Sequence, residues 1–253
     1  TIDHATPSAH YAHTPSRDNY YMIGTQLAES GFDFFGGSGF ACPQDKNNTA
    51  APNLYDLCQE NGYLLAGGYE AAKTNIAAPK MLMVPAECLV DRTRGAGALP
   101  YAIDRQEGDL SLAQIVEVAI EHLGRNDRFF MMAEGGKIDY AGHGNDGATN
   151  IQEVLDFDRA IQLAYRFYEQ HPDETLIVVT ADHETGGMAL GANGGGDVIN
   201  WEVLEKGESE NKAQSAKCGI GWTTGGHSGA PVPTYAIGKG AEKFCGRYDN
   251  TDI

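Results

Sequence analysis

The stretch that decides the fold is residues 175–181 (TLIVVTA), which Asp182 and His183 follow at once. A short run of aliphatic and β-branched residues bounded by charge predicts a buried strand. In open α/β sheets, ligands bind outside the carboxyl ends of the strands. The sequence therefore predicts a strand that ends in a carboxylate and an imidazole, at a place suited to binding a ligand.

Strands and helices alternate on either side of this stretch. Further strands are predicted at residues 128–133 (RFFMMA) and 231–238 (PVPTYAIG), with weaker signals at 32–35, 63–66 and 80–84. Helical periodicity covers residues 20–29, 110–123 and 151–169. The alternation predicts an α/β fold with a mostly parallel central sheet and helices on both faces.

Two of these helices carry more specific signals. Asp109 or Ser111 is expected to cap the helix at residues 110–123. The helix at residues 151–169 has an apolar stripe that includes Ile151, Val154 and Leu155 and that Asp158 interrupts. Such a stripe predicts the buried face of an amphipathic helix.

The composition limits the classes of function. The 253 residues include 35 acidic and 18 basic side chains, and the formal net charge is -17. A surface that binds duplex nucleic acid needs a basic patch, and none is visible, so nucleic acid is not an expected partner. No window approaches the roughly 18 consecutive apolar residues of a membrane span. The five cysteines lack C-x-x-C spacing, which argues against a zinc ribbon.

A first cluster of candidate ligands lies in residues 134–143 (EGGKIDYAGH), where the predicted strand 128–133 ends. Asp139 and His143 are four residues apart, so on a helix both face the same side. A carboxylate and an imidazole on one face suit Zn²⁺. Glu134 can enter the same site from another direction.

Two more clusters complete the set of candidates. His227 lies in TTGGHSGAP, just before the predicted strand 231–238, so it joins the site at Asp182 only if that late strand runs antiparallel. Near the start, Thr6 precedes Pro7, which indicates the beginning of a helix. Arg17, in HTPSR, offers a planar guanidinium for phosphate oxygens.

Taken in order, DHATPSAHYAHTPSR, EGGKIDYAGH, TLIVVTADHETGG and GGHSGAPVPTYAIG resemble the alkaline phosphatase family over nearly the whole chain. The resemblance implies hydrolysis of phosphate monoesters by two zinc ions and one magnesium ion, through a phosphoserine intermediate. It also implies small-molecule phosphate monoesters as substrates, a homodimer, and a location in the periplasm or outside the cell.

The resemblance assigns a role to each candidate residue. The first zinc takes Asp139, His143 and His227, and the second zinc takes Asp182 and His183. The magnesium takes Glu134 and Thr6, with His4 near it. Arg17 matches the guanidinium that clamps the phosphoryl group. Tyr140 lies where relatives carry lysine, histidine or an aromatic residue near the phosphate.

The serine nucleophile of the family lies in an Asp-Ser-Ala context, and this chain contains no Asp-Ser pair. We therefore expect residues 1–253 to form a single catalytic-domain fragment that is inactive or nearly so alone, with a sheet incomplete at its N-terminal side. Residues 186–226 are expected to form a crown-like insertion. Two alternatives stay open: a phosphodiesterase, sulfatase or phosphomutase of the same superfamily, and a metal-binding domain without catalysis.

Overall fold

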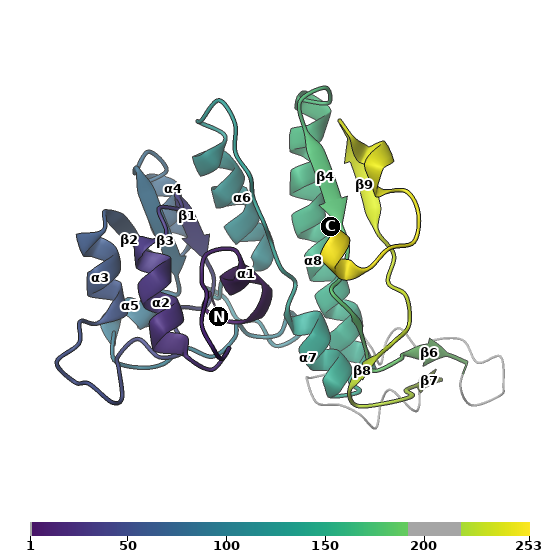
Figure 1. Ribbon diagram of the computed structural model, residues 1–253, viewed down its shortest axis with the longest axis horizontal. Coiled ribbons are helices and arrows are strands. Elements are labelled where there is room, and N and C mark those ends of the chain that lie inside the picture. The colour runs from purple at the N-terminus through teal and green to yellow at the C-terminus, as the bar shows by residue number, and fades with distance from the viewer. Residues whose placement is uncertain (1, 192–218) are drawn as a thin grey trace. The chain divides into compact units, whose positions relative to one another are not determined.

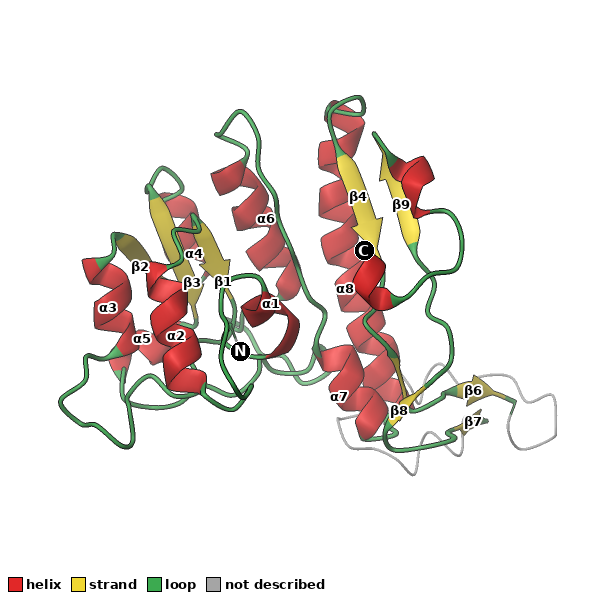
Figure 2. Ribbon diagram, viewed as in Figure 1, coloured by secondary structure: helices red, strands yellow, loops and turns green. Residues whose placement is uncertain are grey.

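The computed structural model describes residues 2–191 and 219–253, in which helices and strands alternate as predicted (Figures 1 and 2). The chain divides into two compact units. The first comprises residues 1–100 and 106–134, and the second comprises residues 101–105 and 135–253. Among the described residues, no helix has the length and apolar character needed to cross a bilayer.

A parallel sheet forms the centre of the first unit. Its strands are β1 (Phe34–Gly36), β2 (Tyr63–Gly67) and β3 (Lys80–Val84), in the order β1-β3-β2. All four residues from Met81 to Val84 are fully buried, because both faces of β3 are covered. Leu82 and Val84 pack into one apolar cluster, and Met81 and Met83 pack into another.

Helices contribute to both of these clusters, which confirms the α/β architecture with helices on both faces of the sheet. Residues of α2 (Tyr20–Glu29) and α3 (Leu54–Glu60) join the first cluster. Residues of α4 (Tyr69–Thr74) and α6 (Leu112–Leu123) join the second. The remaining helices of this unit are the short α1 (Ala5–Ala9) and α5 (Ala86–Val90).

The N-terminus of α6 shows which of the two candidate caps is used. The backbone N–H of Gln114 donates to the Ser111 hydroxyl at 3.1 Å, and the backbone N–H of Ser111 donates to the Gln114 side chain at 2.9 Å. This reciprocal pair is a capping box, so Ser111 is the cap. Asp109 instead accepts a hydrogen bond from the backbone N–H of Gln106.

The second unit is built on two helices and a pair of antiparallel strands. Helix α7 (Lys137–His143) leads into the long α8 (Gly147–Gln170). Strand β4 (Leu176–Val179) pairs antiparallel with β9 (Tyr235–Gly238), and Ile177 lies opposite Ile237. The late antiparallel strand is therefore confirmed. Two short 3₁₀ helices, η1 (Ala241–Phe244) and η2 (Asn250–Asp252), follow β9.

Two pairs of very short strands lie between β4 and β9. Strand β5 (Glu184–Thr185) pairs with β8 (His227–Ser228), and β6 (Ala189–Leu190) pairs with β7 (Ile220–Gly221). Most of the predicted insertion at residues 186–226 falls on residues 192–218, outside the described part of the chain. The insertion and the single-domain organisation stay predictions.

Helix α8 buries a different face from the one predicted. Val154 and Leu155 are each 46% exposed, whereas Glu153 and Asp156 are 7% and 4% exposed. Residues 101–105 explain the difference, because they place polar partners against α8. The backbone N–H of Ala102 donates to Glu153 at 2.6 Å. The Arg105 guanidinium forms a bidentate pair with Asp156 at 2.9 and 2.8 Å.

The strand predicted at residues 128–133 is wrong: within the described chain this segment is irregular, and Phe130 is 71% exposed. A strand requires a ladder of hydrogen bonds to a neighbour, and an apolar sequence alone does not supply one. Glu134 therefore follows a loop and not a strand. The three weaker strand predictions correspond to β1, β2 and β3.

Candidate metal centre

Helix α7 brings the first two candidate ligands together. Asp139 and His143 lie one helical turn apart, and His143 Nε2 is 3.3 Å from Asp139 Oδ1. The second nitrogen of the same ring, Nδ1, lies 2.8 Å from the backbone carbonyl of Gly225. Because a carbonyl only accepts, Nδ1 carries the proton of this contact, and Nε2 is the nitrogen that faces Asp139.

The turn after β4 carries the second pair. Nε2 of His183 lies 3.4 Å from Oδ2 of Asp182, whose side chain is 59% exposed. Strand β5 begins at the next residue, Glu184, so the strand fixes the direction of the chain directly after His183. The position of both residues at the end of β4 agrees with the prediction from the sequence.

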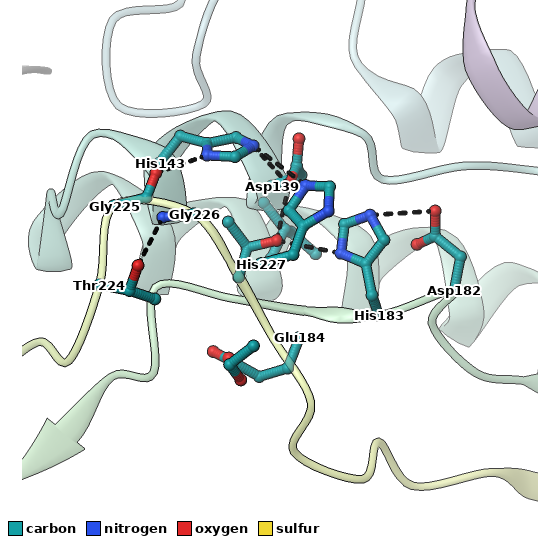
Figure 3. A network of polar contacts seen from close by, with 12 residues as sticks. Asp139, His143, Asp182, His183, Glu184, Thr224, Gly225, Gly226 and His227 are labelled. Atoms are coloured by element: carbon teal, nitrogen blue, oxygen red, sulfur yellow. Dashed lines mark hydrogen bonds and ion pairs between the residues drawn. The ribbon is translucent and has the colours of Figure 1, made fainter.

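The pairing of β5 with β8 brings His227 to the same place. Thr185 lies opposite His227 in the ladder, and the rings of His183 and His227 stack with centroids 3.5 Å apart. His227 Nε2 is 3.2 Å from His143 Nε2 and 3.5 Å from Asp139 Oδ1. Four side chains from three separate segments therefore converge (Figure 3).

The donor atoms of this cluster suit a divalent cation. One ligand atom from each of Asp139, His183 and His227 lies within 4.8 Å of the other two. Imidazole nitrogens combined with a carboxylate oxygen form a typical zinc-binding set. Two imidazole nitrogens only 3.2 Å apart beside a carboxylate are also the arrangement that a bound cation stabilises. The residues present therefore fit zinc.

A clamp of side-chain hydrogen bonds holds the short strands β5 and β8 together. The Ser228 hydroxyl donates to Oε2 of Glu184, and the backbone N–H of Gly187 donates to Oε1 of the same carboxylate at 2.6 Å. Glu184 lies between His183 and Thr185 in the sequence, and Ser228 directly follows His227. The two-residue ladder therefore gains side-chain hydrogen bonds that its own length cannot provide.

Thr185 is a site residue that the sequence analysis did not single out. Its hydroxyl donates to Asp139 Oδ1 at 2.6 Å and lies 3.2 Å from His183 Nδ1. Thr185 lies two positions after His183, so in an extended segment both side chains point to the same face. That spacing within ADHET was the available signal.

The other predicted site residues lie elsewhere. Tyr140, on α7, is 41% exposed, and the ammonium group of Lys137 lies 5.4 Å from its ring centroid. The same ammonium lies 3.4 Å from the ring of Tyr101, and burial lowers the pKa of Lys137. The four remaining residues belong to the first unit: His4, Thr6, Arg17 and Glu134.

Within the first unit, two of these residues contact each other. Arg17 Nη2 lies 2.9 Å from His4 Nε2, and the His4 ring stacks on Tyr20 with centroids 5.9 Å apart. Thr6 lies in α1, which begins at Ala5, two residues before Pro7. The roles of these residues as ligands or phosphate contacts stay predictions.

The fold and the site define an α/β protein with a candidate metal centre of imidazole and carboxylate groups after the end of a strand. Comparisons with known proteins identify its relatives. Residues 95–210 match the family model described as alkaline phosphatase. Alkaline phosphatase 4 of Bacillus subtilis is 31% identical over 310 aligned residues, which cover 99% of this chain and 63% of that protein.

Solved structures agree with these matches. The alkaline phosphatase of the Antarctic bacterium TAB5 is 30% identical, with a TM-score of 0.78 over 100% of this chain and 67% of that one. The cold-active enzyme from Shewanella sp. gives a TM-score of 0.80 at 28% identity, over 99% of this chain and 71% of that one. The chain belongs to the alkaline phosphatase family. It spans about 63% of the length of the Bacillus relative.

Proposed function

We propose that the metal centre of this chain serves the hydrolysis of phosphate monoesters. The observation that carries the proposal is the convergence of Asp139, His183 and His227 within 4.8 Å, with His143 in contact with two of them. Membership of the alkaline phosphatase family supports the same class of reaction.

We assign the candidate ligands of the second unit to two zinc sites. We assign Asp139, His143 and His227 to the first zinc, because their donor atoms lie 3.2 to 3.5 Å from one another. Three protein ligands are the usual number at a catalytic zinc, which keeps one position open. Asp182 and His183 are assigned to the second zinc.

A magnesium site and a phosphate clamp are assigned to the first unit. Carboxylate and hydroxyl oxygens are the ligands that Mg²⁺ prefers, which fits Glu134 and Thr6, with His4 beside them. A solved variant of the TAB5 enzyme has magnesium in its M3 site. Arg17 is exposed and offers two parallel N–H donors to phosphoryl oxygens. In the second unit, Tyr140 keeps the role near the phosphate that the family resemblance assigns to it.

In the proposed reaction, the metal ions and the protein residues have different roles. Divalent cations held by these residues would supply Lewis-acid stabilisation to the attacking and leaving oxygens of an in-line displacement. The chain holds the donors: the Gly225 carbonyl keeps the proton of His143 on Nδ1, and the β5–β8 ladder fixes His227. Because the chain contains no Asp-Ser pair, we expect binding of zinc without turnover of substrate.

Zinc titration of the 253-residue chain, read by competition with a chelating dye, tests this proposal. We expect the His227→Ala variant to lose at least about 100-fold in affinity. His171→Ala is the matched control, because His171 is an exposed histidine at the end of α8. Failure of the parent chain to bind zinc, or an equal loss in the control, would contradict the assignment.

Assays with three esters separate the remaining functions. We expect background rates on p-nitrophenyl phosphate, the corresponding diester and the sulfate ester when zinc and magnesium are added. Turnover of the monoester would show that a nucleophile other than an Asp-Ser serine operates, and faster turnover of the diester or sulfate would favour the alternative classes. Homodimerisation and a location in the periplasm or outside the cell stay predictions from the family.

A further inference from the structure

A single hydroxyl group lies between ligands that we assign to different zinc ions. Thr185 Oγ1 is 2.6 Å from Oδ1 of Asp139 and 3.2 Å from Nδ1 of His183. We propose that Thr185 is a positioning residue that orients the Asp139 carboxylate, selects the tautomer of His183, and so links the two zinc sites. This inference rests on the proposed zinc assignments.

The direction of the two hydrogen bonds follows from the number of protons. A threonine hydroxyl has one proton and two acceptor lone pairs, and an ionised carboxylate can only accept. The short contact with Asp139 therefore takes the hydroxyl proton. A lone pair of the same oxygen then faces His183, so the ring must carry its proton on Nδ1. The other ring nitrogen of His183, Nε2, lies 3.4 Å from Oδ2 of Asp182.

The surroundings of Thr185 hold its side chain in one position. The residue lies opposite His227 in the β5–β8 ladder. Helix α7 passes so closely that a Cβ atom on Gly142 would lie 3.1 Å from Thr185 Cγ2 and 3.2 Å from its Cβ. A β-branched side chain has few rotamers, and this contact restricts it further. The hydroxyl is thus fixed before any ion binds.

The two histidines are oriented by different means. The Gly225 carbonyl fixes His143 at 2.8 Å, and the Thr185 hydroxyl fixes His183. The hydroxyl differs from the carbonyl because it also bonds a carboxylate of the neighbouring zinc site. Removing it releases one ligand of each site, whereas removing the contact with Gly225 would release only one histidine.

Two variants separate this role from a merely structural one. Thr185→Val keeps the shape and removes the hydroxyl, and Thr185→Ser keeps the hydroxyl and removes the methyl group. We expect Thr185→Val to lower the affinity for zinc by about 10- to 100-fold, the usual effect of losing a partner of a metal ligand. Thr185→Ser should stay near the affinity of the parent chain. Thermal unfolding checks that each variant is folded.

Nitrogen NMR of the imidazole groups in the zinc-free parent chain gives a second measurement that needs no variant. We expect the proton of His183 on Nδ1. A proton on Nε2, or equal zinc affinities for the parent chain and a folded Thr185→Val, would overturn the inference. Loss of affinity in Thr185→Ser as large as in Thr185→Val would also overturn it. A parent chain that binds no zinc would refute the proposed function instead, and the NMR result would still decide the tautomer.

Discussion

The close approach of α7 to β5 makes Gly142 a sensitive position for the whole metal centre. A Cβ atom there would lie 2.8 Å from the backbone carbonyl oxygen of Thr185, as well as close to its side chain. A backbone oxygen cannot rotate away. We therefore expect Gly142→Ala to push α7, which carries Asp139 and His143, away from the strand that carries Thr185.

The size of the effect follows from the distance. Ordinary contacts between heavy atoms lie at roughly 3.5 Å, so the two elements must separate by roughly 0.7 Å. Overpacking of this kind costs about 1–3 kcal/mol, and the better helix propensity of alanine offsets up to about 1 kcal/mol. We expect a net loss near 1 kcal/mol, or a Tm lower by about 2–4 °C. A shift beyond about 0.5 Å also disturbs ligand geometry, so zinc affinity should fall about tenfold.

Gly144→Ala is the matched control for this prediction. A Cβ atom on Gly144 would lie 3.4 Å or more from its nearest neighbours, and its φ of -71° suits any residue. We expect the control to keep its Tm and its affinity for zinc, measured by calorimetry and by dye competition. If Gly142→Ala matched Gly144→Ala in both measurements, the close approach of α7 to β5 would not be what holds the ligands.

Two further predictions concern the polar face of α8. Arg105→Met should lower the free energy of unfolding by about 3 kcal/mol, because the Asp156 carboxylate stays buried without its bidentate partner. Adding Asp156→Leu to this variant should restore most of the loss. If thermal unfolding shows no recovery in the double variant, this account is wrong. Burial raises the pKa of Glu153, so the folded chain holds this proton more tightly than the unfolded chain does. The stability from this proton is complete below the unfolded pKa and is lost as the pH rises through the folded pKa. Relative to Glu153→Gln, the parent chain should therefore lose stability as the pH rises above the ordinary pKa of a glutamate. Urea unfolding measures this difference, and a difference that stays constant with pH would show that the pKa of Glu153 is not raised.

Local chemistry was sufficient to predict several elements and ligands. The i, i+4 spacing predicted that Asp139 and His143 share one side of a helix, and α7 has this arrangement. The charged end of an apolar run predicted Asp182 and His183 at the end of β4. Signals of this kind depend only on residues within a turn or two of each other, so the sequence displays them directly.

Predictions failed where the outcome depended on a partner distant in the chain. Residues 128–133 have the composition of a strand, but within the described structure they lack a ladder. The acidic residues Glu153 and Asp156 have the composition of a solvated helix face, but residues 101–105 bury them with a backbone N–H and a guanidinium. Composition records a tendency to be buried or solvated, and a partner can override it.

By itself, the sequence determined the alternation of strands and helices and the residue types able to hold zinc. It also narrowed the capping residue of α6 to two candidates. Only the tertiary structure decided that His227 stacks on His183 and that the Thr185 hydroxyl lies between Asp139 and His183. The physical reason is that a two-residue ladder is too short to leave a pattern in the sequence. Its geometry comes from the packing of α7 against β5 and from the clamp at Glu184.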